Sequence, residues 1–374
     1  MDKQVNVIIL GGGPAGAACG IALQRQGVAN CIIDKAVFPR PKTCGGMVTE
    51  KTYRLLRPIF DDDEARLAGL FCRTETEVAA FDNTTLLAHC QPELPLRLAD
   101  RFHFDNELVR RYRELGGTLF EGQREYTIDY DGRAVTLEDG SRIPYRYLVF
   151  ADGALSRAHR DFGIRRELSF CVETFLPGDA LETRGGEIHF GVLADGYLWV
   201  FPYGDRVCVG LGCTYEKGFP YRETLAGFLR ETGVSPEGQD VRGAFVPWGW
   251  TAPQDRLPDN VLLIGDAGGF VDPIYGEGLY FALLSGRTAA EALAADDPKR
   301  TFLRNMQPAY QIIRNGKKLQ PFLFSLLMRK GFINRLRGRN GFLKYYCDHQ
   351  MSVYDFDHNK AKIMTAYRRQ KKGK

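Results

Sequence analysis

The chain has 374 residues, 44% of them hydrophobic and 26% charged, with a formal net charge of +4, a composition typical of a globular protein with a large core. No apolar run is long enough to span a bilayer as a helix, and the N-terminus lacks the basic segment and long apolar stretch of a secretory signal. The nine cysteines include no CxxC pair and the six histidines show no metal-ligand spacing. We therefore expect a cytoplasmic protein in reducing surroundings that binds no metal.

The first predicted elements follow the order of a dinucleotide-binding unit. Residues 5–10 form an apolar, β-branched run that leads directly into Gly-Gly-Gly-Pro-Ala-Gly at 11–16. A helical pattern continues to about Gly27, and residues 31–34 predict a second strand that ends on an acid. A strand, a GxGxxG turn, a helix and a second strand with a terminal acid together form the dinucleotide fingerprint.

Each residue of this fingerprint has a physical role. Gly11 allows the tight turn, Gly13 lets the backbone approach a pyrophosphate, and Gly16 lets the helix pack closely on the strand. The free N–H groups at the start of the helix, around Ala15, and the positive end of its dipole favour phosphates. Asp34 is expected to accept hydrogen bonds from ribose hydroxyl groups.

Two later segments favour FAD over NAD as the nucleotide. Residues 148–153 predict an apolar strand that closes on Asp152, and residues 261–269 predict another that closes on Asp266. With the N-terminal fingerprint, they resemble the glutathione-reductase-type FAD domain of the p-hydroxybenzoate hydroxylase superfamily in order and spacing. That resemblance implies that Asp152 lies near the pyrophosphate and that Asp266 binds the ribityl chain.

Three further stretches resemble the geranylgeranyl reductase family of that superfamily. Residues 38–47 read Phe-Pro-Arg-Pro-Lys-Thr-Cys-Gly-Gly-Met, similar to the family segment FPRxKxCGG. Residues 196–202, with Gly-Leu-Gly at 210–212, match its YxWxFP…GxG pattern. Residues 265–284 resemble its GDAAGxxxPxxGEGI segment. The resemblance as a whole extends from residue 1 to about residue 300.

The resemblance implies roles for individual residues. The residues expected to contact FAD are Gly11, Gly13, Ala15, Gly16, Asp34, Lys35, Cys44, Gly45, Gly46, Met47, Arg101, Asp152, Gly265, Asp266, Gly276, Gly278 and Leu279. In the family the YxWxFP strand lines a lipid pocket, and the alternation of a strand points its three aromatic side chains to one face. The expected substrate pocket consists of Tyr197, Trp199, Phe201 and Pro202. Two other interpretations stay open: the aromatic face is ordinary core, and Arg101 is a surface residue.

The predicted fold is α/β, α+β overall, with a Rossmann-like FAD domain of the glutathione-reductase type. This domain is expected to be discontinuous and to comprise residues 1–70, 96–165 and 255–300. Residues 71–95 and 166–254 are expected to form a mostly antiparallel, substrate-binding sheet over the flavin, and residues 301–374 a basic helical C-terminal unit.

The implied reaction is the reduction of isoprenoid double bonds by hydride transfer from N5 of reduced FAD, with a prenyl lipid or a quinone as substrate. An isolated alkene accepts hydride poorly, so a proton must reach the second carbon with or ahead of the hydride. Cys44 and Tyr197 are candidate catalytic proton donors by their expected position, and Glu277 is a third. Two other functions stay open: a flavin-dependent monooxygenase or halogenase acting on an aromatic substrate, and a membrane-docked electron-relay flavoprotein.

The partners follow from what the chain lacks and from its C-terminus. Because only one nucleotide fingerprint occurs, the electron donor is expected to be NAD(P)H on a transient visit or a ferredoxin-like protein. Residues 299–374 hold 19 Lys and Arg against three Asp and Glu. An apolar stretch at 322–328 before a basic cluster at 329–339 suggests peripheral docking on anionic lipid at the inner face of the membrane. A helix packed on the core with a solvated basic side explains it equally well. Nucleic-acid binding is not expected, because no nucleic-acid fold motif is present.

Overall fold

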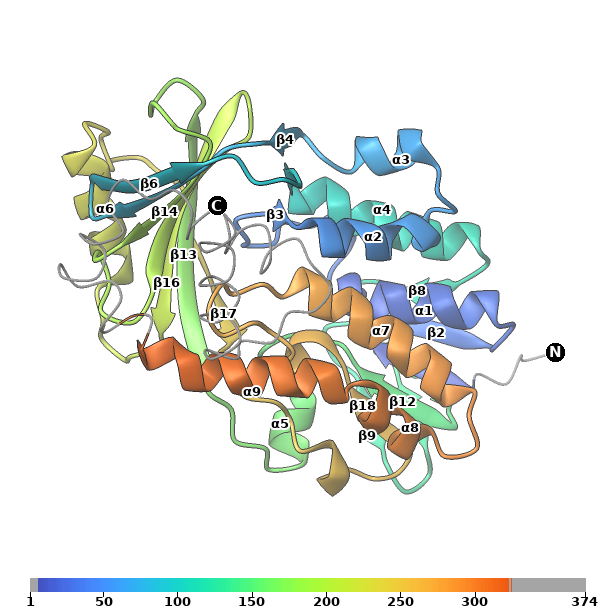
Figure 1. The fold of residues 1–374 in the computed structure, drawn as a ribbon. Coiled ribbons are helices and arrows are strands. Elements are labelled where there is room, and N and C mark those ends of the chain that lie inside the picture. The colour runs from blue at the N-terminus through green and yellow to red at the C-terminus, as the bar shows by residue number, and fades with distance from the viewer. Residues whose placement is uncertain (1–5, 323, 325–374) are drawn as a thin grey trace, which may run out of the picture.

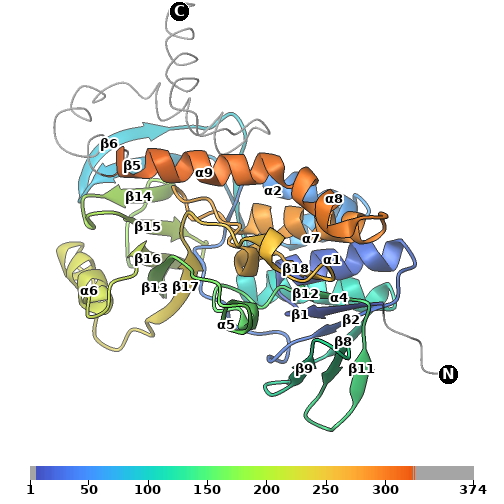
Figure 2. The same cartoon turned by 90° about the horizontal axis from the view of Figure 1, so that it is seen from below.

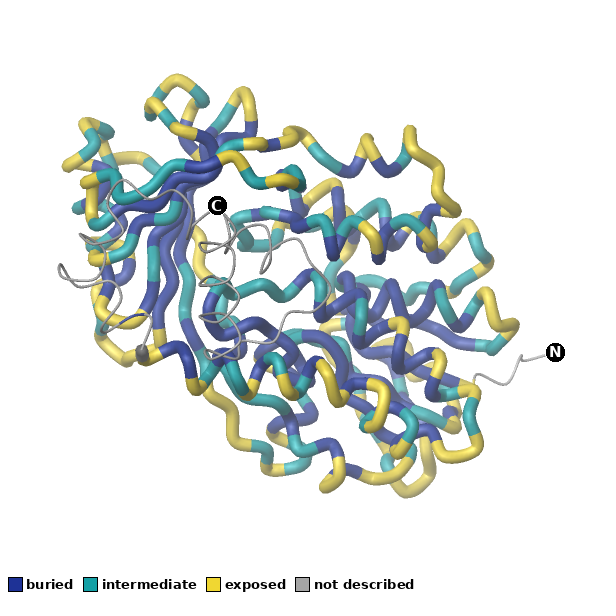
Figure 3. The backbone as a smooth tube through the Cα atoms, viewed as in Figure 1, coloured by how far each residue is buried: buried dark blue, intermediate teal, exposed yellow. Residues whose placement is uncertain are grey.

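Two large sheets stand side by side in the computed structural model, which describes residues 6–322 and residue 324 (Figure 1). One of them is a parallel sheet of five strands. In spatial order its strands are β18 (Val261–Leu263), β12 (Tyr147–Phe150), β1 (Val7–Leu10), β2 (Asn30–Ile33) and β8 (Thr118–Phe120). Strands β1, β2 and β18 are buried at every residue, as their continuous apolar runs predict for a parallel sheet covered on both faces. Figure 3 shows this buried centre in dark blue, with the exposed segments concentrated in the surrounding turns.

The two faces of the parallel sheet are covered by different layers. One face packs against helices, which are α1 (Pro14–Arg25), α2 (Glu50–Ile59), α4 (Arg101–Glu114), α7 (Leu279–Leu293) and α8 (Pro298–Asn305). The other face packs against a three-stranded antiparallel sheet and a short helix, which are β9 (Thr127–Asp129), β10 (Ala134–Thr136), β11 (Arg142–Pro144) and α5 (Arg157–Asp161). Successive side chains of a strand point to opposite faces of the sheet, so each strand packs against both layers. Ile9 and Ile32 face the helices, whereas Ile8 and Ile33 face the small sheet.

The second large sheet has seven strands. In spatial order they are β17 (Arg242–Pro247), β13 (Leu168–Pro177), β16 (Arg206–Thr214), β15 (Tyr197–Pro202), β14 (Gly186–Phe190), β5 (Val78–Asp82) and β6 (Thr85–Cys90). Every neighbouring pair is antiparallel except β14 and β5, which are parallel. Helix α6 (Tyr221–Glu231) covers one face, where Leu225 and Phe228 pack with Leu198 and Val200 (Figure 1, left edge). The opposite face is therefore free to line a cavity.

Another small antiparallel sheet forms within residues 47–98. It consists of β3 (Met47–Val48), β7 (Leu96–Leu98) and β4 (Arg73–Glu75). Residues 71–95 are thus divided, because β4 pairs with β7 whereas β5 and β6 extend the seven-stranded sheet. The domain boundaries drawn from the sequence stay a prediction.

Helix α9 (Gln307–Phe322) runs from α8 to the edge of the seven-stranded sheet, which both views show (Figures 1 and 2). Gln320 Nε2 donates to Pro273 O over 2.8 Å, and Lys317 pairs with Glu167 at 3.0 Å. Within the expected C-terminal unit, residues 301–305 of α8 and all of α9 are helical. The basic cluster at 329–339 lies outside the described residues. No helix within the described part of the chain has the length and apolar character needed to cross a membrane.

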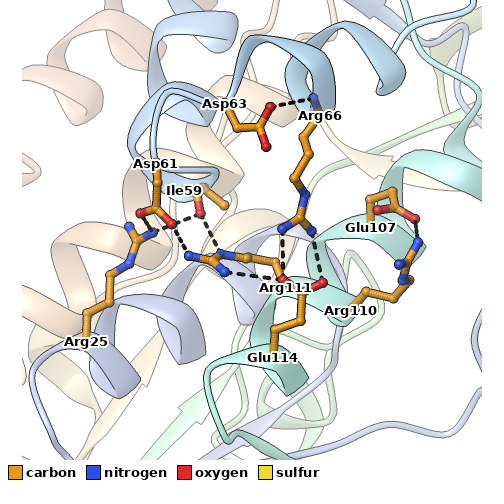
Figure 4. A network of polar contacts seen from close by, with 9 residues as sticks. All are labelled: Arg25, Ile59, Asp61, Asp63, Arg66, Glu107, Arg110, Arg111 and Glu114. Atoms are coloured by element: carbon orange, nitrogen blue, oxygen red, sulfur yellow. Dashed lines mark hydrogen bonds and ion pairs between the residues drawn. The ribbon is translucent and has the colours of Figure 1, made fainter.

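A network of ion pairs links the outer ends of the helical layer (Figure 4). It joins α1, α4, α3 (Glu64–Gly69) and the segment that connects α2 to α3. Arg66 binds Glu114 through both nitrogens, at 2.9 and 3.1 Å, and Arg111 Nε donates to Ile59 O over 3.2 Å. Exposed ion pairs of this kind contribute about 0–1 kcal/mol each, so the buried core carries most of the stability of this layer.

Candidate FAD and substrate site

A cavity of about 1790 Å³ is lined by residues of both large sheets. Its wall includes residues that directly follow four parallel strands: Gly11 after β1, Asp34 after β2, Asp152 just beyond β12 and Asp266 just beyond β18. Ligands of open α/β sheets bind outside the carboxyl ends of the strands. The cavity therefore joins a nucleotide-binding edge to the free face of the seven-stranded sheet.

The start of α1 presents bare backbone to this cavity. A Cβ on Gly16 would lie 1.9 Å from Gly11 O, so Gly16 packs the helix on the strand and does not line the cavity. Gly13 does line the cavity, and the nearest atom to a Cβ placed there is Arg40 Nη2 at 3.5 Å. The N-terminus of α1 is thus open to a ligand such as a phosphate, which its N–H groups and dipole would favour.

Two acids that were predicted to contact the nucleotide line the cavity, but their hydrogen bonds differ. Asp34 accepts backbone hydrogen bonds from Gly12 N at 2.6 Å and Ala36 N at 2.7 Å. Asp152 Oδ2 accepts from Arg157 N at 2.8 Å, whereas its Oδ1 is buried without a hydrogen-bond partner among residues 6–322 and 324. Burial raises the pKa of the Asp152 carboxyl. Lys35 also lines the cavity and is exposed.

Asp266 and the start of α7 face the same cavity. The chain leaves β18 through a short 3-10 turn, Gly265–Gly268, and α7 begins at Leu279 with Gly278 as its N-cap residue. The Asp266 carboxylate makes no side-chain hydrogen bond within the described residues, and Oδ1 lies 3.4 Å from a Cβ placed on Gly278. Burial raises the pKa of Asp266. An acid that is half-buried without a partner is costly, and ligand hydroxyl groups at this place would satisfy it.

The other predicted residues of this region differ in their contact with the cavity. Gly276, Gly278 and Leu279 line it, and so does Ala15. Gly265 does not, because a Cβ there would lie 2.7 Å from the Ala15 Cβ, so this glycine packs the turn on α1.

Two arginines share one buried acid beside the start of α1. Arg101 is 7% exposed and binds Asp105 through two hydrogen bonds, at 2.7 and 3.0 Å. It is therefore a buried residue and not a surface arginine. Burial alone would lower the pKa of Arg101, but Asp105 and Cys44 outweigh it, and the pKa is raised. Arg40 lies 3.4 Å from the same Asp105, and both guanidinium groups line the cavity. Arg40 belongs to the Phe-Pro-Arg-Pro-Lys segment, and no role for it was predicted from the sequence.

The Cys44–Gly45–Gly46 loop is fixed against the seven-stranded sheet. Cys44 N donates to Glu173 Oε1 over 2.9 Å, and Tyr203 Oη donates to Gly45 O over 2.9 Å. Gly46 has φ +70°, and a Cβ there would lie 1.9 Å from Tyr203 Oη. Glu173 and Tyr203 were not predicted from the sequence. A single acid inside the apolar run of β13, residues 168–177, is the signal that could have indicated Glu173.

Strand β15 places its aromatic side chains on the cavity face. Tyr197, Trp199 and Phe201 line the cavity, whereas Pro202 is buried outside it. Tyr197 Oη donates to Tyr275 O, and burial raises the pKa of Tyr197. The same wall continues in apolar side chains of neighbouring strands and of the C-terminal segment, which are Val78, Ala80, Leu87, Ala88, Ile188, Phe190, Trp248 and Phe324.

Glu277 lies just before the start of α7, and three side chains from residues 49–52 bind its carboxylate. Its Oε2 forms an ion pair with Lys51, and its Oε1 accepts from Thr49 at 2.7 Å and from Thr52 at 3.2 Å. Among the described residues, no three His, Cys, Asp or Glu side chains are grouped as metal ligands would be.

Comparisons with known proteins agree with this geometry. The family described as FAD binding domain matches residues 4–176. An uncharacterised protein of Methanosarcina barkeri is 30% identical over 331 residues, which are 86% of this chain and 83% of that protein. A menaquinone reductase of Mycobacterium tuberculosis is 28% identical over 80% of this chain and 79% of its own length. Digeranylgeranylglycerophospholipid reductase 1 of Methanopyrus kandleri is 29% identical, over 82% and 86% of the two chains.

Solved structures show the same fold. A geranylgeranyl bacteriochlorophyll reductase-like protein from Thermoplasma acidophilum superposes with a TM-score of 0.77 at 16% identity, covering 97% of this chain and 96% of that one. A flavin-dependent brominase superposes with a TM-score of 0.74 at 20% identity, covering 100% of both chains. At these identities the likeness concerns the fold alone. The matched family, the flavoprotein fold and the open glycine-rich edge identify the cofactor as FAD.

Proposed function

Because the chain belongs to the geranylgeranyl reductase family of FAD-dependent oxidoreductases, we propose that it reduces carbon–carbon double bonds in an isoprenoid chain carried by a lipid or a quinone. One observation carries this proposal. The glycine-rich edge that fits FAD and the apolar, aromatic face of the seven-stranded sheet line a single cavity. A prenyl chain on that face would lie beside the cofactor, with its apolar surface removed from water.

We assign the parts of FAD to separate groups of residues. The start of α1 with Gly13 and Ala15 would bind the pyrophosphate, with Arg40 and Arg101 as cationic partners. The ribose would contact Asp34 and Lys35, and Asp152 would lie near the pyrophosphate. The ribityl chain would hydrogen-bond to Asp266. Gly276, Gly278 and Leu279, at the positive end of α7, would face the pyrimidine edge of the flavin, and residues 44–47 would pass beside its ring system.

Bound FAD in its reduced form supplies a hydride. The chain contributes position and surroundings: Tyr197, Trp199 and Phe201 form a wall that holds the prenyl chain and excludes water from the reacting carbons. Because an isolated double bond is a weak hydride acceptor, the same wall must also contain or admit an acid.

The names of the relatives support a carrier-bound chain. They act, by name, on menaquinone in Mycobacterium tuberculosis and on a digeranylgeranylglycerophospholipid in Methanopyrus kandleri. We extend this to a prenyl quinone or prenyl lipid for the present chain. We also propose NAD(P)H or a ferredoxin-like protein as electron donor, and contact with anionic membrane through the basic C-terminus.

The test is a mass-spectrometric assay of the purified, FAD-loaded protein, reduced chemically without oxygen and offered geranylgeranyl lipids and a polyprenyl quinone. Product masses that rise in steps of two hydrogens would support the proposal and identify the carrier. Unchanged prenyl chains, with flavin that stays reduced until oxygen and an aromatic substrate enter, would favour the monooxygenase or halogenase. Unchanged chains with rapid electron exchange between partner proteins would favour the relay.

Two variants of strand β6 distinguish a blocked substrate pocket from a general effect of the substitution on the protein. Ala88 lines the cavity, whereas Thr85 on the same strand is exposed and does not. Ala88→Trp should fill the pocket and lower prenyl reduction while FAD stays bound, and Thr85→Trp should leave both unchanged. Equal activity of the two variants would place the substrate elsewhere.

A further inference from the structure

The proposed reduction needs an acid in the cavity, and on that basis we propose that Glu173 supplies the proton. Glu173 lies on β13, the strand next to the edge strand β17 of the seven-stranded sheet, and is 3% exposed. It lines the cavity together with Trp199 and Phe201. A carboxyl group at this place borders the space that we assign to the prenyl chain.

The contacts of Glu173 leave one of its oxygens available for an acidic proton. Oε1 accepts the hydrogen bond from Cys44 N at 2.9 Å. Oε2 accepts a long hydrogen bond, 3.8 Å, from the Cys208 thiol. The loop thus anchors the carboxyl group by one oxygen, and the hydrogen bond from Cys44 N also stabilises the carboxylate that remains after proton loss.

The three acids expected from the sequence are less suited to this step. Tyr197 already donates its proton to Tyr275 O. Glu277 is paired with Lys51 and accepts two threonine hydroxyl groups, so both of its oxygens are already engaged. The Cys44 sulfur accepts a hydrogen bond from Gly46 N at 3.4 Å, which ties the thiol into its own loop.

The surroundings of Glu173 favour its neutral form overall. Burial raises the pKa of this carboxyl. The hydrogen bonds from Cys44 N and the Cys208 thiol, and the charges of Lys42 and Arg101, oppose that rise only in part. On β17, Arg242 is the backbone partner of Glu173, and its guanidinium group pairs with Asp240. Three further titratable side chains interact with Glu173 electrostatically: Cys171, Cys208 and Tyr203.

The proton balance of the step is complete. The O–H bond of Glu173 breaks, its electron pair stays on the carboxylate, and the proton forms a C–H bond with the π electrons of the double bond. The other carbon takes the hydride that reduced FAD supplies. After the product leaves, the carboxylate regains a proton from water that enters the open cavity.

The experiment compares Glu173→Gln with Glu187→Gln in FAD-loaded, full-length protein. Glu187 is a second buried carboxyl of the same sheet, 5% exposed, and it does not line the cavity. In Glu173→Gln the amide keeps an oxygen that can accept from Cys44 N, so a purely positioning role would survive. Two quantities are measured: single-turnover reduction of the best prenyl substrate across pH, and the infrared band of the protonated carboxyl without substrate.

We expect Glu173→Gln to lower the single-turnover rate about 100-fold or more, and Glu187→Gln to match the wild type. The wild-type rate should fall as pH rises through the raised pKa of Glu173, and the variant should lose that dependence. The carboxyl band should persist above the ordinary pKa of glutamic acid, about 4.3, and should be absent in Glu173→Gln.

Two results would overturn the assignment while the reductase function stands: a Glu173→Gln rate within a few-fold of the wild type, or a carboxyl that is ionised at and above its ordinary pKa. A wild-type protein that reduces no prenyl substrate would instead refute the proposed function, and the assigned acid with it.

Discussion

Lys51 on α2 and Glu277 at the start of α7 form an ion pair whose side chains are only 3% and 11% exposed. Thr49 and Thr52 donate hydrogen bonds to the same carboxylate. The pair ties the Gly-Glu-Gly turn, which opens onto the cavity, to the neighbouring helix. Removing one charge of a buried pair leaves the other unpaired at high cost, so the pair helps to fix where α7 begins.

Removing either partner of this pair should cost more than removing both. Lys51→Met leaves a buried carboxylate and Glu277→Gln leaves a buried ammonium group, so we expect each to lower the free energy of unfolding by about 3–5 kcal/mol. The double variant should lose clearly less than the sum of the two. Urea denaturation of the three variants measures this, and strictly additive losses would show that the pair is not coupled.

Gly46→Ala should destabilise the protein more than a similar change elsewhere. The residue has φ +70°, and its Cβ would lie 1.9 Å from Tyr203 Oη and 2.4 Å from the backbone oxygen of Ala99, which cannot move aside. Gly116 has φ +86° and no atom within 4 Å of a Cβ, so Gly116→Ala measures the backbone cost alone, about 1–2 kcal/mol. We expect Gly46→Ala to cost about 1–3 kcal/mol more and to lower the FAD content of the purified protein. Equal thermal unfolding of the two variants would contradict the packing seen around the loop.

The sequence predicted the FAD fold because its signals are local. The strand–glycine–helix order at residues 5–16 and the acids that close three apolar strands are read within short windows, and the structure and the comparisons confirm the fold class and the cofactor. Alternation along a single strand likewise predicted the shared face of Tyr197, Trp199 and Phe201, which the structure shows.

The parts that were missed depend on contacts between distant segments. Glu173 meets Cys44 across 129 positions, and this contact depends on how the loop docks on the seven-stranded sheet. Strand β5 pairs in parallel with β14, and no local pattern encodes the direction of this pairing. Arg40 belongs to a motif that was identified in the sequence, but only the fold brings it to Asp105, which also binds Arg101.

The surface network of Figure 4 should matter little by comparison. The side chains of Arg66 and Glu114 are 30% and 38% exposed, so we expect Glu114→Gln to cost less than about 1 kcal/mol. The hydrogen bond from Arg66 lowers the pKa of Glu114. Its contribution is therefore present above the ordinary pKa, about 4.3, and is lost as pH falls through the lowered pKa of the folded protein. Thermal melting at low and high salt checks the first point and melting across pH the second, and a loss comparable to that of Lys51→Met would contradict the small contribution.

Asp266→Ala should weaken FAD binding and yet stabilise the protein without FAD. The Asp266 carboxylate has no hydrogen-bond partner in the described part of the chain, so its burial costs free energy until a ligand hydroxyl group donates to it. Loss of a hydrogen bond to a charged group corresponds to about 1.5–3 kcal/mol, or roughly 10- to 100-fold in affinity. Flavin fluorescence titration measures the affinity, and the fully exposed Asp259 supplies the control variant, Asp259→Asn.

The pH dependence of the FAD-free protein supplies the second readout for Asp266. Burial raises the pKa of this carboxyl in the folded state, so the ionised group lowers stability at neutral pH. That cost should shrink as pH falls through the raised folded pKa, and it should disappear below the pKa of the unfolded chain, about 3.9. The stability difference between Asp266→Ala and the wild type should therefore be largest at neutral pH and vanish in acid. A difference that does not change with pH, or a variant that binds FAD as tightly as the wild type, would show that Asp266 does not bind the cofactor as an unpartnered carboxylate.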